Sequence, residues 1–293
     1  MSRAERAPVA RSLYDQVAEQ TASIVIRRYS TSFGLASRLL EPGVRQHVEN
    51  IYALVRVADE IVDGTALDTL AAGRALNELE TSAHLAMDLG YSANLVVHAF
   101  ALTAREVDFG TDLTEPFFES MRMDLTQAVH DQDSFDRYVY GSAEVVGLMC
   151  LRAFVQHESP DEAQDARLVH GARALGAAFQ KVNFLRDLAA DFETLGRSYF
   201  PGVDVAKFTE DDKLRLVDDI DNDLRVSGEV IPELPPGSRR AVALAHGLFA
   251  ELSRRLRATP ASELVRTRVR VPNPIKARIA LGAAIGGRSG RIR

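Results

Sequence analysis

The sequence of 293 residues contains no tryptophan and a single cysteine, Cys150. One cysteine excludes a disulfide framework and is consistent with a reducing, cytoplasmic setting. Histidine clusters are missing too, because the seven histidines never recur at the spacing of zinc ligands. With 46% hydrophobic and 26% charged residues, the chain nevertheless has ample material for a buried core, which excludes disorder.

Long apolar runs are also missing. No segment approaches the ~18 consecutive apolar residues of a membrane-spanning helix, and residues 1–12 lack the apolar stretch of a signal peptide. No Pro-, Gly- or Ser-rich linker divides the chain. We therefore expect one domain, residues 1–293, that is cytoplasmic and does not cross a membrane.

Acidic residues are absent from the C-terminal tail, residues 264–293, which carries eight arginines and lysines. The net charge of the chain is −6, so residues 1–263 carry −14. An acidic body makes nucleic acid an unexpected partner, whereas the basic tail favours an anionic surface or a phosphorylated ligand. The alternative for the tail is a solvated, partly frayed terminus.

Apolar residues recur at helical spacing almost throughout the chain, as in Val44, Val48, Ile51 and Val55. Gly110 and several Pro-Gly pairs indicate helix ends, and strand-like alternation is confined to short pieces such as residues 269–271. We therefore predict an all-α fold, a closed bundle with a central cavity. The expected helices are roughly 9–29, 43–63, 68–89, 92–109, 114–130, 134–156, 162–193, 207–226, 237–258 and 273–285.

Two predicted helices carry acidic residues four positions apart. Asp59 and Asp63 share one helix face with Tyr52 and Arg56. Carboxylates one turn apart repel each other, so a bound cation is a natural reason to keep them, although one such motif alone also fits an exposed acidic helix end.

A second copy of the pattern favours a cation site over an exposed acidic helix end. Gln180, Asn183, Asp187 and Asp191 share a face of a later helix, and Arg186 flanks them as Arg56 flanks the first motif. Oxygen ligands without clustered histidine or cysteine favour a hard cation, Mg²⁺ or alternatively Mn²⁺, held jointly by carboxylates and substrate phosphates. Facing each other, the two motifs would clamp a diphosphate.

These segments resemble the squalene/phytoene synthases, the head-to-head prenyl transferases. The resemblance covers about residues 20–280 and rests on residues 30–33, 52–63, 138–147, 175–191, 196–201 and 268–271. It implies an isoprenoid-synthase-type helical fold in which Mg²⁺ bridges the acidic motifs and a prenyl diphosphate.

Carried over residue by residue, the resemblance implies three groups of side chains. The metal ligands would be Asp59, Asp63, Asn183, Asp187 and Asp191. Diphosphate oxygens would contact Arg56, Gln180, Arg186, Arg197, Tyr199 and Arg268. The first substrate would lie against Ser30, Ser32, Phe33, Tyr52 and Tyr138, where the two tyrosines would orient or stabilise a carbocation or would instead be buried structural hydroxyls.

The sequence departs from the family pattern in three places. Glu60 stands where many relatives have a second aspartate, which keeps a carboxylate at that position. Arg197 follows Asp191 at an interval of six positions where the usual interval is five, and residues 248–252 lack a tyrosine that relatives often have.

The resemblance favours a phytoene synthase that joins two geranylgeranyl diphosphates through a cyclopropylcarbinyl diphosphate, as the first step of carotenoid biosynthesis. Residues 183–191 and 270–276 look most like bacterial carotenoid-pathway members, and the small Ala36 and Ser37 would leave depth for a C20 chain. NADPH is then not expected. The alternatives are a squalene, hydroxysqualene or dehydrosqualene synthase that uses farnesyl diphosphate, and a non-catalytic helical assembly factor.

A C20 substrate and a C40 product are poorly soluble in water. An enzyme that handles them is expected to work at a membrane surface without crossing it, peripherally at the inner face, and the basic tail suits such a contact.

Overall fold

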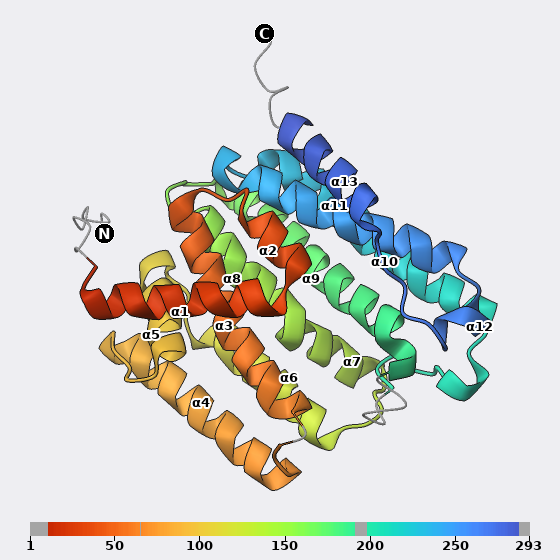
Figure 1. Ribbon diagram of the computed structural model, residues 1–293, viewed down its shortest axis with the longest axis horizontal. Coiled ribbons are helices and arrows are strands. Elements are labelled where there is room, and N and C mark those ends of the chain that lie inside the picture. Colours follow the sequence, from red (N-terminus) through yellow and green to blue (C-terminus); the bar gives the residue numbers. More distant parts are fainter. Residues whose placement is uncertain (1–10, 65, 191–197, 287–293) are drawn as a thin grey trace.

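The computed structural model describes residues 11–64, 66–190 and 198–286. Figure 1 shows a bundle in which the N-terminal helices occupy one side and the C-terminal helices the other. The helices are α1 Leu13–Tyr29, α2 Thr31–Ser37, α3 Pro42–Asp63, α4 Thr69–Leu89, α5 Leu95–Val107, α6 Thr111–Thr126, α7 Gln132–Val139, α8 Val145–Phe154, α9 Glu162–Ala190, α10 Glu210–Val230, α11 Pro236–Ala258, α12 Ala261–Leu264 and α13 Asn273–Gly286. A π-helical turn, η1 Tyr140–Glu144, joins α7 to α8, and the 3₁₀ turns η3 Val205–Lys207 and η4 Ile231–Glu233 flank α10.

The all-α prediction is confirmed. Every predicted range contains a helix, and the β-structure found among the described residues is an isolated bridge between Val129 and Ser198. The short helices α2 and α12 were not predicted, because seven and four residues are too few to produce a clear apolar period.

The sequence interpretation of Gly110 was wrong. Helix α5 ends before Asp108, which takes the left-handed conformation at φ 63°, and Gly110 instead caps the N-terminus of α6. Aspartate is one of the few residues other than glycine that adopts this conformation readily, so it can end a helix in glycine's place.

Two hydrophobic cores lie on either side of a central space. One joins α3, α4, α5, α6 and α8, around Ile51, Leu76, Phe100 and Phe117. The other joins α7, α9, α10 and α11, around Val182, Leu185, Ile220 and Leu256. Because each helix buries one face in a core, several helices keep a second face for the space between the cores.

Helix α3 illustrates this division. It begins with Pro42 at its first position and ends at Asp63, before Gly64. Ile51, Leu54 and Ala58 are buried in the first core. Tyr52 and Asp59 point from an adjacent strip of the helix into the central space, so α3 supports the core and the site at once.

The π turn between α7 and α8 lies close to α6. A Cβ atom on Gly141 would lie 2.1 Å from the carbonyl oxygen of Pro116, so no larger residue fits there without movement of α6. On the other side of the π turn, a Cβ atom on Gly176 of α9 would lie 2.5 Å from the carbonyl oxygen of Ala143. These close approaches fix α6, the π turn and α9 around the central space. Such π turns occur frequently at functional sites.

The C-terminal helix α13 lies along α11 at the outside of the bundle (Figure 1). Ile279, Ala280 and Ala283 pack against Leu244 and Leu248 of α11. The expected helix at 273–285 is therefore present and packed. Among the described helices, none has the length and apolar character needed to span a membrane.

Candidate active site

The space between the two cores is a cavity of about 470 Å³. Its wall is formed by α1, α2, α3, α6, α7, η1, α8, α9, α10, η4, α11, Leu234 and Tyr199. The wall is mainly apolar, and its carboxylates and amides gather at one end: Asp59, Asp63, Asp124, Gln180, Asn183 and Asp187. This end opens to the surface, because Asp63 is exposed to solvent. From Asp187 to Leu168 at the apolar end, α9 rises roughly 28 Å.

The structure places the two predicted acidic motifs on the wall of this one cavity. Asp59 and Asp63 come from the last turns of α3, and Asn183 and Asp187 come from the last turns of α9. Each motif lies on a single helix, so the spacing of three or four residues brings its members to one face. Asp191 and Arg197 lie outside the described residues.

The carboxyl group of Asp59 has a perturbed pKa. Burial raises its pKa to about 7, against the lowering effect of Arg56, and the charges of Asp63 and Asp124 raise it further. Close to neutral pH this group is therefore shared between its protonated and ionised forms. A cation bound among these carboxylates would replace the proton and stabilise the ionised form.

Asp124 on α6 belongs to the site but was missed by the sequence interpretation. Its two carboxylate oxygens accept hydrogen bonds from the hydroxyls of Tyr138, at 2.7 Å, and Tyr199, at 3.1 Å. A weak signal was available, because Asp124 follows buried Phe117 and Met121 along the apolar stripe of α6. Its partners lie 14 and 75 residues away, so their convergence was not visible in the sequence.

Tyr138 lines the cavity and is almost fully buried. Burial raises the pKa of its hydroxyl well above the usual value, and neighbouring Asp124 raises it further. Tyr199 stacks on Phe184 with ring centroids 4.0 Å apart. Both hydroxyls thus donate to Asp124, an arrangement that serves the structure and presents aromatic rings to the cavity.

Asp187 of the second motif is already paired. Arg186 Nε donates to its Oδ1 at 3.0 Å, and Arg268 Nε lies 2.7 Å from the same oxygen. Arg268 comes from the extended segment between α12 and α13 and is half exposed. Arg186 and Arg268 lie at the rim of the cavity and are not part of its wall.

Arg56 lies beside the first motif. It forms an ion pair with Glu60 and lies 3.8 Å from Asp59, and its guanidinium covers the ring of Tyr29. Its Nε is buried and has no hydrogen-bond partner among the described residues. Glu60 is turned to Arg56 and is not part of the cavity wall, so the carboxylate kept at this position is not placed with those of Asp59 and Asp63.

The predicted first-substrate residues divide into two groups. Phe33, Tyr52 and Tyr138 line the cavity, and so do the small residues Ala36 and Ser37. Ser30 instead caps α2 by accepting a hydrogen bond from the backbone nitrogen of Phe33 at 3.1 Å, and it is not part of the wall. The side chain of Ser32 lies outside the described part of the chain.

Phe249 stands in the helix where no tyrosine was found. It stacks on Phe179 with ring centroids 3.8 Å apart and lies 6.0 Å from the ring of Phe33. An aromatic group therefore supports the cavity wall at this position without a hydroxyl.

The donor atoms at the polar end suit an oxygen-liganded cation. Among the described residues, no three or more His, Cys, Asp or Glu side chains are arranged to hold a metal ion by themselves. Carboxylates from α3 and α9 in one cavity, with an amide at Asn183, instead fit a cation whose remaining ligands are phosphate oxygens, the arrangement that Mg²⁺ prefers. Arg56 is not part of the cavity wall, and its buried Nε lies beside the first motif with no hydrogen-bond partner among the described residues.

Comparison with known proteins agrees with this geometry. The sequence pattern of the squalene/phytoene synthase family matches residues 26–274. A 15-cis-phytoene synthase from Paracoccus sp. is 27% identical over 81% of this chain and 81% of its own length. A bifunctional lycopene cyclase/phytoene synthase from Blakeslea trispora is 30% identical over 60% of this chain, but the match spans 31% of that longer protein.

Among solved structures, a dehydrosqualene synthase in complex with a ligand superposes with a TM-score of 0.76 at 22% identity, over 93% of this chain and 97% of the other. At this identity the likeness establishes the fold alone. The match over residues 26–274 goes further: this chain belongs to the squalene/phytoene synthase family. Membership implies a prenyl transferase that acts on prenyl diphosphates.

Proposed function

We propose that the protein is a phytoene synthase, which joins two molecules of geranylgeranyl diphosphate head to head through a cyclopropylcarbinyl diphosphate, in a Mg²⁺-dependent reaction that begins carotenoid biosynthesis. The observation that carries this proposal is the single cavity that residues of both acidic motifs line, together with its mainly apolar walls. The phytoene synthases among its relatives support the same activity.

The polar end would bind the diphosphate. Asp59, Asp63, Asn183 and Asp187, with Asp191, would hold Mg²⁺, which supplies positive charge to the departing diphosphate. Arg56 would donate from its unpartnered Nε. Arg186 and Arg268 now pair with Asp187, and they would turn to diphosphate oxygens when the carboxylate takes another partner.

The apolar walls would hold the prenyl chains and exclude water from the carbocation. Aromatic faces stabilise cations without reacting with them, and Phe33, Tyr52 and Tyr138 line the chamber. Asp124 would keep the hydroxyls of Tyr138 and Tyr199 oriented. Proton loss from the last cation would end the reaction, so NADPH is not required for the C40 triene.

The deciding experiment is incubation of the purified protein with geranylgeranyl diphosphate and Mg²⁺, with and without NADPH, followed by identification of the extracted hydrocarbon. A C40 triene formed without NADPH is the expected product. A C30 product from farnesyl diphosphate alone would replace the proposal with a squalene, hydroxysqualene or dehydrosqualene synthase. A folded protein that converts neither substrate would favour a non-catalytic assembly role.

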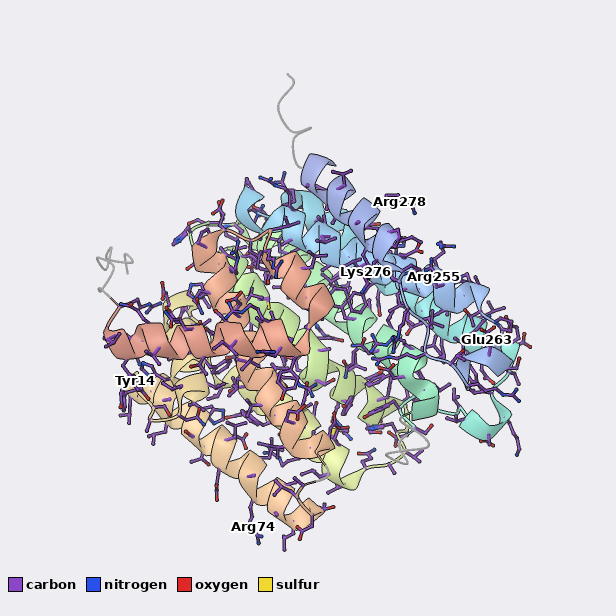
Figure 2. All side chains as sticks on the ribbon, viewed as in Figure 1. Tyr14, Arg74, Arg255, Glu263, Lys276 and Arg278 are labelled. Atoms are coloured by element: carbon purple, nitrogen blue, oxygen red, sulfur yellow. The ribbon has the colours of Figure 1, made fainter. Side chains whose placement is uncertain are left out.

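We also propose a peripheral contact with membranes through α13. Lys276 and Arg278 lie on this helix at the periphery of the molecule (Figure 2), and Leu281 is 62% exposed. Basic and apolar side chains together favour an anionic lipid surface. Flotation with vesicles containing phosphatidylglycerol tests the contact, which substitution of Lys276 and Arg278 by glutamine should weaken. Equal flotation of both proteins would contradict it.

A further inference from the structure

The apolar end of the cavity is closed by the short connection between α10 and α11. Ile231 and Leu234 from this connection line the cavity together with Val230 at the end of α10, Leu151 and Leu168. The same leucines, with Val155 and Val242, form a separate apolar cluster apart from the two main cores. The floor of the chamber is therefore a small cluster of its own.

A second cleft lies on the outer side of this floor. It has a volume of about 250 Å³ and a largely polar lining that includes Glu158, Gln164 and Arg239. Two residues line both the chamber and the cleft, namely Leu168 of α9 and Leu234. At 3% and 5% exposure, each is almost completely covered. Among the residues that the structure describes, these two belong to both walls, so they form the partition between an apolar chamber and a cleft at the surface.

Hydrogen bonds and an ion pair on the outer side hold the partition in position. The guanidinium of Arg239 donates to the carbonyl oxygen of Leu234 from Nε at 2.9 Å and from Nη2 at 2.7 Å. Arg167 of α9 forms a two-armed ion pair with Glu233, at 2.9 Å for the Nη2 to Oε2 contact. These contacts tie the connection to α9 and α11, so the position of Leu234 is held on both sides.

We propose that Leu168 and Leu234 set the length of the prenyl chain that the chamber accepts. This inference rests on the proposed function and deepens it by assigning the residues that select the substrate. A chain too long for the chamber would place its last carbons where these side chains already pack, and close-packed interiors do not admit such overlap. Truncating either leucine would join the chamber to the outer cleft and give a longer chain a path outward.

The two walls also supply a matched control. Val155 belongs to the same apolar cluster and lines the outer cleft, but it does not line the chamber. Val155→Ala removes apolar volume beside the partition and should weaken the fold in a similar way. It should leave the selection of chain length unchanged, because the inner wall stays intact.

The experiment compares Leu168→Ala, Leu234→Ala and Val155→Ala with the wild type in competition between C15, C20 and C25 diphosphates. Differences of a few carbons in an apolar pocket are worth roughly 10-fold or more in specificity. We expect both leucine variants to raise the use of C25 relative to C20 by about 10-fold, whereas Val155→Ala changes the ratio by less than about 2-fold. Equal ratios in all four proteins would overturn the proposal.

Two additions keep the outcome interpretable. Leu234→Phe should shift use towards C15 and covers the case in which the alanine variants fail to fold. Thermal stabilisation by unreactive thiolodiphosphates of the same three lengths measures binding without turnover. If the wild type forms no product, the proposed function is wrong, but the role of the partition is still supported when Leu234→Ala binds longer thiolodiphosphates than the wild type does. If the wild type turns over normally and the leucine variants change neither the competition ratio nor the chain length that is bound, only the proposed role of the partition is wrong.

Discussion

The two acidic motifs are close copies in sequence and differ in their electrostatic surroundings. On α3, Asp59 lies near the carboxylates of Asp63 and Asp124, and its pKa is raised to about 7. On α9, Asp187 forms ion pairs with Arg186 and Arg268. Both motifs place an aspartate on the wall of the same cavity, with an arginine close by in the sequence.

This difference indicates that the binding of a cation would have different electrostatic consequences at the two motifs. At Asp59 a cation would replace a proton and relieve repulsion among carboxylates. At Asp187 it would compete with two guanidinium groups, which would then be available to the diphosphate. The first motif would thus drive cation binding, and the second would couple it to the arginines that receive the anion.

The largest expected effect is the loss of either aspartate. Asp59→Ala and Asp187→Ala should each lower hydrocarbon formation by at least about 100-fold, because charge stabilisation at the departing diphosphate is removed. Helical circular dichroism should stay at the wild-type level. Glu60→Ala is the matched control, since Glu60 is adjacent to Asp59 but pairs with Arg56 outside the cavity wall. Full Mg²⁺-dependent activity in either variant would show that the substituted aspartate is not a ligand of the metal ion.

Asp124→Asn sharpens the comparison from the α3 side. The variant removes a negative charge that raises the pKa of Asp59, and it weakens the acceptor shared by Tyr138 and Tyr199. We expect kcat to fall by about 10-fold and the acidic limb of the pH profile to move to lower pH.

Tyr199→Phe removes one of the hydrogen bonds to Asp124 but keeps its charge. It should lower kcat without moving the acidic limb. Identical pH profiles for the wild type, Asp124→Asn and Tyr199→Phe would show that Asp124 does not influence Asp59 during the reaction.

Arg268→Gln tests the α9 side. Without this arginine, Asp187 loses one of its cationic partners, so Mg²⁺ should stabilise the substrate-free variant at lower concentration than the wild type. KM for the prenyl diphosphate should rise, because a donor to the diphosphate is gone. The readouts are a Mg²⁺ titration of Tm and steady-state kinetics. A variant that needs more Mg²⁺ without substrate would contradict the competition between Arg268 and the cation.

The smallest expected effect is on stability against pH. The folded-state pKa of Asp59, about 7, lies above its ordinary value of 3.8, so the folded state holds the proton more tightly. The associated stability is present below the ordinary value and is lost as the pH rises through 7. In the presence of a chelator, the Tm of Asp59→Asn should therefore be a few degrees higher than that of the wild type at pH 8. The two Tm values should be equal near pH 4. Added Mg²⁺ should close the gap at pH 8, and a gap independent of pH would argue against the raised pKa.

The sequence interpretation reached parts of this site and missed others for a physical reason. Asp59, Asp63, Asn183 and Asp187 were found because helical spacing is local and can be read from a few residues. Asp124 was missed because its importance comes from Tyr138 and Tyr199, which approach it through the packing of α6 against other segments. Gly110 was misplaced because glycine, although more frequent after helix ends, also occurs at N-caps.

The sequence by itself determined the helices, the two acidic motifs and the likeness to one family, because helical period and residue spacing are properties of short segments. Only the tertiary structure decided which carboxylates lie beside other carboxylates and which beside arginines, since electrostatic energy depends on distance in space. It also decided where the chamber ends. Leu168 and Leu234 are 66 positions apart in the sequence, and they meet as a partition only when α9 and the α10–α11 connection pack together.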